Sequence, residues 1–355
     1  MLRTQHSHSL ARRGITLVET AVAAAAVAAV AVTAVPVFRK VGCNAMRAQS
    51  ATQMASLSAA HASYAADFND RQFTMCPDNL GQYGGNFSSY QQVNGCVEPA
   101  VFGTNAAGQT YVAGPGCPSD TTGGGAFLTA FQFTTNPGIG AFRLQNVRQF
   151  NQYVGGRFLD QAFYAPDDPG VNRRVQRNID AGSDFEVDGY AYSTYDYSPA
   201  AMFHPSVMGD GSSASSPIFR PPNATTTAGG FGHQSPTNAQ CVHPSLKTRM
   251  LERHAMENSP GVNPSIAGGT TPYAWNQSMR SRSLALFFDG SVRVFTTQEA
   301  MDAEERAGGA KLWMRSTPVG GFGYNGTFAH DFLVKTSVHY LTTFGIKGRD
   351  TLAQP

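Results

Sequence analysis

The sequence predicts an α+β fold, in which a long N-terminal helix packs on a C-terminal, antiparallel β-rich head domain. Residues 15–38 form an almost uncharged apolar run, and residues 39–68 repeat apolar and small side chains at helical spacing. From about residue 69, Gly, Pro, Asn and Ser separate short aromatic and β-branched runs. We therefore divide the chain into a basic leader (1–14), an apolar transmembrane helix (15–38), its amphipathic continuation (39–68) and a head with long Gly/Pro/Ser loops (69–355).

The composition favours an exported protein and gives no sign of a nucleic-acid partner. Charged residues make up 14% of the chain, well below the roughly 25% of an average soluble domain. The formal net charge is +2, so no strong field indicates a nucleic-acid partner, and none is expected. The low charge favours an exported protein.

The chain has five cysteines, and none of them forms a C-x-x-C pair. Cys76 and Cys96 flank a Gly- and Asn-rich stretch, and a disulfide between them is possible if the head lies outside the cytoplasm. Such a bridge would contribute roughly 3 kcal/mol in the chain-entropy picture. The odd count leaves at least one thiol free, and Cys43 is our candidate.

The apolar run at 15–38 carries a single charge, Glu19. As a helix it would span about 36 Å, enough for a hydrocarbon core of about 30 Å. A cleavable secretory signal or a plain transmembrane anchor would explain its hydrophobicity, with the basic side in the cytoplasm. Neither explains Glu19, because an acid inside an apolar span costs about 2.5–3.5 kcal/mol and indicates a function.

A third interpretation accounts for Glu19. The stretch RRGITLVE resembles the type IV prepilin cleavage and methylation motif, with Ile where Phe is commonest. The matching residues are Arg12 and Arg13 in the leader, Gly14 and Ile15 at the cleavage point, and Glu19 and Pro36 in the apolar run. The resemblance implies that prepilin peptidase cuts between Gly14 and Ile15 and usually methylates the new amine. It also implies that Glu19 pairs with that amine in a neighbouring subunit and that Pro36 bends the helix.

The spacing in the continuation at 39–68 predicts an amphipathic helix, and the resemblance to pilin-like subunits implies that this helix packs on a β-sheet. Its apolar stripe consists of Val41, Met46, Met54, Leu57, Ala60, Tyr64 and Phe68. On the same segment, His61 is interpreted as a histidine at the surface or the edge of the core.

Runs at 129–135, 188–197 and 283–295 predict strands in the head. The clearest is a hairpin with a two-residue turn at Asp289-Gly290, which would be central and buried. This turn would place Phe287 and Ala285 on the same face as Val292 and Val294. A helix is expected next, with Thr296 and Glu299 as a capping box and Gly308 as its stop. The stretch LFFDGSVRVF resembles a bacterial prepilin-like signature, His-x9-Asp-Gly, although Met279 occupies the position of the His.

Two groups of side chains have the chemistry of metal ligands. His233, Cys241, His243 and His254 could bind zinc, but their spacing matches no standard site. Asp180, Asp184, Glu186 and Asp188 form the densest acidic cluster, without the arrangement of the calcium loops of some pseudopilins. No catalytic or phosphate-binding motif is present. We therefore predict no catalytic residue, no metal, no cofactor and no enzyme activity.

The resemblance implies a structural subunit that assembles into a type IV pilus or a type II secretion pseudopilus. Its partners would be prepilin peptidase, other pilin or pseudopilin subunits and the inner membrane. The expected location is the bacterial inner membrane, crossed once with the head outside the cytoplasm, and then a filament in the periplasm or at the cell surface. The alternative is a membrane-anchored extracytoplasmic binding module or exoenzyme that uses a pilin-like anchor.

Overall fold

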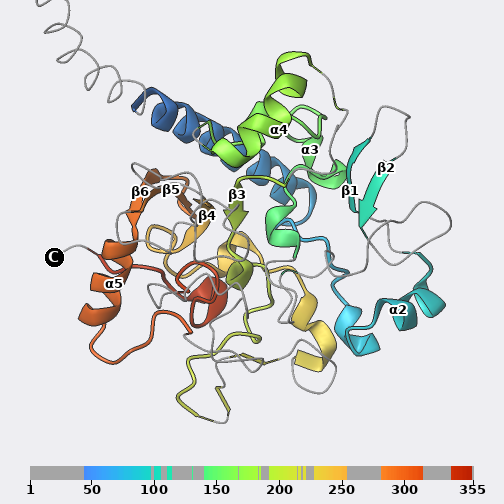
Figure 1. Ribbon diagram of the computed structural model, residues 1–355. Coiled ribbons are helices and arrows are strands. Elements are labelled where there is room, and N and C mark those ends of the chain that lie inside the picture. The colour runs from blue at the N-terminus through green and yellow to red at the C-terminus, as the bar shows by residue number, and fades with distance from the viewer. Residues whose placement is uncertain are drawn as a thin grey trace, which may run out of the picture. The chain divides into compact units, whose positions relative to one another are not determined.

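The computed structural model describes residues 44–96, 100–104, 110–113, 130, 140–166, 168–182, 184, 192–213, 215–216, 219–220, 228–253, 281–314 and 337–353. The chain divides into two units, Met1–Met46 and Arg47–Pro355, and the packing below is within the second. In this part of the chain the fold is α+β, with a four-stranded antiparallel sheet (Figure 1).

A long helix over residues 44–67 opens the described part, and we call it the long helix. The other α-helices are α2 (Phe87–Asn94), α3 (Arg148–Asn151), α4 (Pro169–Asp180) and α5 (Thr297–Arg306). The strands are β1 (Ala100–Thr104), β2 (Thr110–Ala113), β3 (Tyr195–Tyr197), β4 (Thr248–Glu252), β5 (Arg282–Phe287) and β6 (Val292–Thr296). Short 3₁₀ helices lie at Leu80–Tyr83, Ala141–Arg143, Gln161–Phe163, Pro199–Ala201, Ala228–His233, Asn238–Gln240 and Gly345–Lys347.

The main sheet has the order β3-β4-β5-β6, and every neighbouring pair is antiparallel. All five residues of β4 are buried, whereas most of the edge strand β6 is half-buried. Strands β1 and β2 form a separate hairpin with an irregular register. Of the predicted strand runs, 188–197 contributes only Tyr195–Tyr197 among the described residues, and 129–135 is described only at Ala130.

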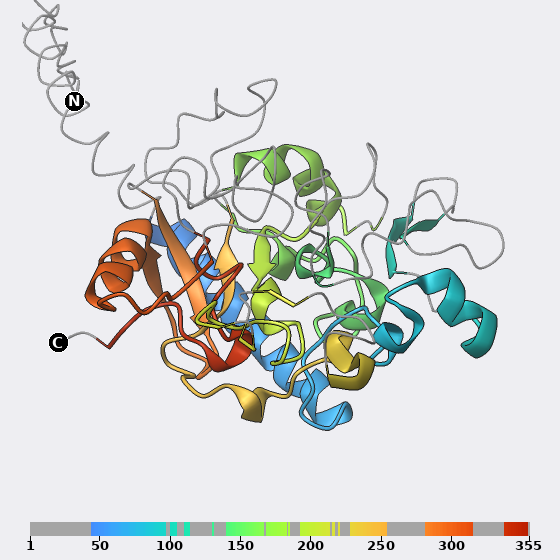
Figure 2. The same cartoon turned by 90° about the horizontal axis from the view of Figure 1, so that it is seen from below.

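The inner face of the long helix packs on the sheet through apolar side chains. Met54, Leu57 and Ala60 are buried in the same core cluster as residues of β3, β4 and β5. Figure 2 shows the long helix, in blue, beside these strands. The helix ends at residue 67, and Phe68, which was expected in the apolar stripe, is 45% exposed.

Polar contacts fix the position of the long helix on the sheet. The Tyr195 hydroxyl donates to Gln53 Oε1 at 2.6 Å and lies 2.9 Å from Ser50 Oγ. Ser50 also donates to Glu252, whose other carboxylate oxygen accepts from the Leu284 amide at 2.9 Å. Because both Ser50 and Glu252 are buried, these bonds specify how far along the sheet the helix lies.

The predicted fold class is wrong in one respect. No helix within the described ranges is both long enough and apolar enough to cross a membrane. Residues 15–38, which were predicted to be that helix, lie outside the described residues. The predicted single-pass location in the inner membrane depended on a spanning helix, and it is corrected by the same finding.

The β5–β6 hairpin has a different turn from the one predicted. The Gly290 amide donates to the Phe287 carbonyl at 3.0 Å, and the Phe287 amide donates to the Ser291 carbonyl at 2.9 Å. Residues 288–290 therefore form a three-residue loop, closed by Gly290 at φ +85°. The register shifts by one residue, so that Leu286, not Phe287, lies opposite Val292.

The predicted helix after this hairpin is confirmed as α5. The Thr296 hydroxyl caps it by accepting from the Glu299 amide at 2.9 Å. The side chain of Glu299 instead forms an ion pair with Arg293 at 2.7 Å. The helix ends at Arg306, two residues before Gly308, which has φ +63°.

Candidate functional site

The residues predicted to direct processing and assembly are not described by the structure. Arg12, Arg13, Gly14, Ile15, Glu19 and Pro36 all lie outside the described residues. Their predicted roles stay predictions.

The predicted disulfide between Cys76 and Cys96 is wrong. Cys76 is a free, buried thiol, and Cys96 is disulfide-bonded to a different cysteine. Burial raises the pKa of the Cys76 thiol well above its ordinary value, and the nearby Asp78 adds to the effect. Cys76 is therefore expected to be a poor nucleophile in the folded protein.

The four residues considered as possible zinc ligands, for which no metal was predicted, form no metal site in the described part of the chain. His233 is buried, Cys241 is a partly exposed free thiol, and His254 lies outside the described residues. Within the residues that the structure covers, no group of three or more His, Cys, Asp or Glu could hold a metal ion.

The acidic cluster is engaged in local contacts. Asp180 accepts from the Gln176 amide group at 2.7 Å within α4. Asp184 accepts from the Leu159 backbone amide at 3.2 Å and lies 3.8 Å from Arg157. Glu186 and Asp188 lie outside the described residues. The two described carboxylates thus stabilise local structure.

His61 occupies the core and not its edge, so the interpretation made from the sequence is wrong. Its ring lies 4.3 Å from the Phe150 ring and 5.0 Å from the Tyr197 ring, and the side chain is buried. Burial lowers the pKa of His61 well below its ordinary value, and the positive charge of Arg249 lowers it further. The long helix therefore presents a neutral imidazole to the sheet.

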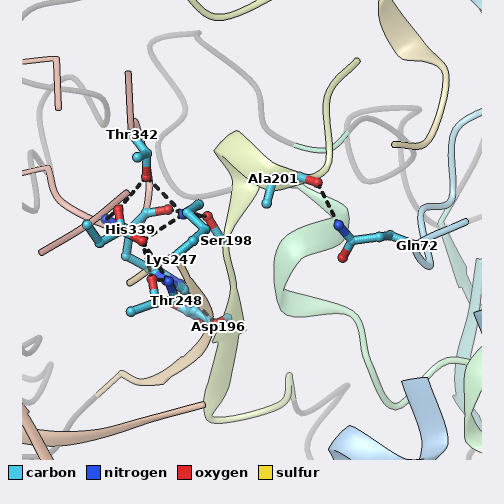
Figure 3. A network of polar contacts seen from close by, with 9 residues as sticks. Gln72, Asp196, Ser198, Ala201, Lys247, Thr248, His339 and Thr342 are labelled. Carbon is cyan, nitrogen blue, oxygen red and sulfur yellow. Dashed lines mark hydrogen bonds and ion pairs between the residues drawn. The ribbon is translucent and has the colours of Figure 1, made fainter. Parts of the chain in front are cut away.

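The most concentrated polar chemistry of the described part lies between β4 and the C-terminal segment 337–353 (Figure 3). Lys247 precedes β4, and its Nζ lies 2.7 Å from Asp350 Oδ2. The same Nζ donates to Ser198 Oγ at 2.8 Å and to Thr342 Oγ1 at 2.9 Å. Since both charged side chains have 0% exposure, every proton of this ammonium group has a protein acceptor and none faces water.

The Asp350 carboxylate accepts hydrogen bonds from several further donors. Oδ2 accepts from the Thr248 amide at 2.9 Å and from the Thr248 hydroxyl at 2.5 Å. Oδ1 accepts from the His339 amide at 3.0 Å and from the Thr342 hydroxyl at 2.5 Å. The carboxylate is thus held by two backbone N–H groups, two hydroxyls and one ammonium group.

His339 connects this network to the sheet. Its Nδ1 lies 2.8 Å from Thr248 Oγ1, and its Nε2 lies 3.1 Å from the Asp196 carbonyl oxygen of β3. Its backbone has φ +74°, which is uncommon for a residue other than glycine. Ser198 donates to the His339 carbonyl. The uncommon backbone conformation is therefore fixed by hydrogen bonds to the amide and the carbonyl of His339 and by the contact of its ring with Thr248.

The network shifts the pKa values of its members. Burial lowers the pKa of Lys247, although Asp350 opposes the shift. Burial alone would raise the pKa of Asp350, but the attraction of Lys247 and the hydrogen bonds of the carboxylate outweigh it, and the pKa is lowered. Burial and the repulsion of Lys247 lower the pKa of His339 to about 3. At neutral pH, Lys247 and Asp350 form an ion pair beside a neutral His339.

A second group of polar side chains continues the network along β3. The Tyr340 hydroxyl donates to Asp196 Oδ2 at 2.7 Å, and Arg253 forms an ion pair with Asp196 Oδ1 at 3.5 Å. All three side chains are buried. The C-terminal segment therefore contacts β3 and β4 through charged and hydroxyl groups and not only through its apolar residues.

Sequence reasoning did not find this network. Lys247 and Asp350 are 103 residues apart, and no local pattern marks either of them as buried. The sequence offered one indirect sign that this segment is buried. Residues 337–346 contain hydroxyl, histidine and apolar side chains, and no Lys or Glu precedes Lys347.

A surface hollow of about 320 Å³ lies at α5. Its lining residues are Thr296, Gln298, Glu299, Asp302 and Arg306. Glu299 is paired with Arg293, and Asp302 accepts from Gln298 at 2.7 Å. These internal contacts leave the hollow without a convergent set of ligand-binding groups.

Comparison with known proteins adds no identification. No protein-family model matches the chain, and no curated protein or solved structure matches it significantly.

Proposed function

We propose that this chain is a prepilin-like structural subunit, which prepilin peptidase cuts between Gly14 and Ile15 and which then assembles into a type IV pilus or a type II secretion pseudopilus. The observation that carries the proposal is the stretch RRGITLVE, which stands at the start of an apolar run. In this proposal Glu19 pairs with the new N-terminal amine of a neighbouring subunit.

The arrangement of the long helix supports this proposal. Its inner face packs on an antiparallel sheet, as expected for a subunit that holds its head on a helical stem. Its exposed positions within 48–66 are Ala48, Thr52, Ala55, Ser56, Ala59, Ala62, Ser63 and Ala66. Up to the exposed Asp67 at the end of the helix this face carries no charge, whereas α5 has Glu, Asp and Arg side chains on its surface. Small uncharged side chains allow another helix to approach closely.

A structural role, without catalysis, is also supported by the polar network. Lys247, Asp350 and His339 have the chemistry of catalytic groups, but all three have 0% exposure. A substrate cannot reach them without local unfolding. The proposal therefore assigns them to the stability of the head.

The test is mass spectrometry of the protein from its native host. The proposal predicts a mature chain that begins at N-methylated Ile15. Gly14→Leu is expected to block cleavage, because a side chain at this position obstructs the backbone. Glu19→Gln is expected to leave cleavage intact and to reduce incorporation into filaments, since it removes the charge that pairs with the amine.

Two outcomes would contradict the proposal. A mature chain that begins at Met1 or Leu2 would exclude processing by prepilin peptidase, and a start within or beyond the Ala-rich run would indicate ordinary secretion. As a matched control, Thr20→Ser alters the residue beside Glu19 without changing charge, and it should be processed and incorporated like the wild type.

A further inference from the structure

We propose that Lys247 and Asp350 condense into an intramolecular isopeptide bond, in which Lys247 Nζ is joined to Asp350 Cγ and one water is released. This inference concerns the head alone and does not depend on the proposed function. It rests on the enclosure of the pair, on a hydroxyl that bridges the amine and the carboxylate, and on backbone donors at the carboxylate oxygens.

The two reacting groups are already in contact and shielded from solvent. Nζ lies 2.7 Å from Oδ2, and both side chains have 0% exposure. Groups held in this way react as if at an effective concentration of about 10⁵–10⁸ M when their geometry is favourable. Burial also lowers the pKa of Lys247, which favours the neutral amine that must act as the nucleophile.

Thr342 provides the path for the protons. Its Oγ1 accepts from Lys247 Nζ at 2.9 Å and donates to Asp350 Oδ1 at 2.5 Å. One proton can therefore move from the ammonium to Thr342 while Thr342 passes its own proton to Oδ1. The ion pair becomes a neutral amine beside a neutral carboxylic acid without any external acid or base.

The next step forms the new bond. The Nζ lone pair attacks Cγ, and the electrons of the Cγ–Oδ2 double bond move onto Oδ2. The Thr248 amide, at 2.9 Å, and the Thr248 hydroxyl, at 2.5 Å, already donate to this oxygen and would stabilise its negative charge.

The last step expels water. A second proton passes from Nζ through Thr342 to Oδ1, the Cγ–Oδ1 bond breaks, and Oδ1 leaves with two protons as water. Oδ2 becomes the amide carbonyl oxygen, and Nζ retains one proton. The charges of the ammonium and the carboxylate cancel, so that atoms and electrons balance without a co-reactant.

The test is the intact mass of the purified full-length chain after reduction of its disulfides. The expected mass is lower by one water than the mass calculated from the observed N-terminus. Trypsin cuts after Arg349, so the C-terminal peptide Asp350–Pro355 should be recovered attached to the peptide that contains Lys247, with no cleavage after Lys247.

An intact mass that shows no loss of water would overturn the proposal. If the mass equals the calculated value after prolonged incubation, and Asp350–Pro355 is recovered as a free peptide, the contact is an ion pair only. This result decides the question on the wild-type protein, even if a variant fails to fold. It would leave the proposed processing at Gly14 untouched.

Two variants test the chemistry. Lys247→Met removes the nucleophile and should retain the full calculated mass. Thr342→Val keeps the two reacting groups but removes the hydroxyl that bridges them, and bond formation should slow at least tenfold. If Thr342→Val loses water as fast as the wild type, the proposed proton path is wrong.

Discussion

Acidification should destabilise the head through His339, and the size of the effect follows from its surroundings. Burial lowers the pKa of the ring, and Lys247 lowers it further, to about 3, while the Lys247–Asp350 pair is ionic; in the condensed protein the burial remains and has the same sign. In the unfolded chain a histidine has a pKa of about 6.5. Between these two values the unfolded state binds one more proton than the folded state, so stability falls as the pH decreases below about 6.5.

The magnitude can be worked out for pH 5. Protonation of the histidine stabilises the unfolded chain by about 1.36 kcal/mol for each pH unit below its pKa, while the histidine of the folded chain stays neutral. Because of His339, the free energy of unfolding is then lower by about 2 kcal/mol at pH 5 than at pH 7.5. The pKa of His61 is also lowered, first by burial and then by Arg249, so His61 contributes a loss of the same sign.

The assay is urea unfolding at pH 7.5 and pH 5, on the wild type and on His339→Asn. Asn has no charge at either pH and tolerates the left-handed backbone at this position. The substitution is expected to lower the stability at pH 7.5 and to reduce its pH dependence by about 2 kcal/mol. Because the other histidines contribute equally to both proteins, they cancel in the comparison. Equal pH dependence in the two proteins would refute the reasoning.

Three further substitutions probe the packing of the head by denaturant unfolding. Leu57→Ala removes a fully buried side chain of the long helix and should lower the free energy of unfolding by about 2–5 kcal/mol. The control Ala59→Ser, at an exposed position of the same helix, should lower it by under about 0.5 kcal/mol. Similar values for both variants would mean that the helix does not pack on the sheet as described. Gly348→Ala places a Cβ against the Thr343 carbonyl and should cost about 1–3 kcal/mol, and an unchanged midpoint would contradict that close approach. Thr296→Ala removes the cap of α5 and should cost about 1 kcal/mol, while Thr296→Ser should restore most of it.

The sequence predicted those features of the fold that depend on residues close together along the chain, such as helix ends and the buried face of a helix. A hydroxyl at Thr296 followed by Glu299 and later by Gly308 predicted where α5 begins and ends, because caps depend on neighbours within a few residues. The spacing of Met54, Leu57 and Ala60 likewise predicted which face of the long helix is buried.

The hairpin shows where such local signals become ambiguous. Asp289-Gly290 is typical of a two-residue turn, but the same pair also ends a three-residue loop in which only Gly290 needs a positive φ. The choice between them shifts the register by one residue and so changes every partner in the ladder.

The polar network could not be predicted, because its members are adjacent only after folding. Lys and Asp lie at the surface of most proteins, so a sequence gives no reason to place Lys247 and Asp350 in the core. The disulfide prediction failed for a related reason. Short separation along the chain favoured Cys76 as the partner of Cys96, but the fold places Cys76 in the core as a free thiol.

The distance along the chain between Lys247 and Asp350 has a consequence for biosynthesis. Asp350 follows Lys247 by 103 residues, so a ribosome working at about 5–20 residues per second makes the carboxylate roughly 5–20 seconds after the lysine. Until then, strand β4 cannot be buried without enclosing an unpaired positive charge, which is strongly unfavourable. The main sheet is therefore expected to close late, and a chain interrupted before Asp350 should remain open to proteases instead of accumulating as a nearly complete head.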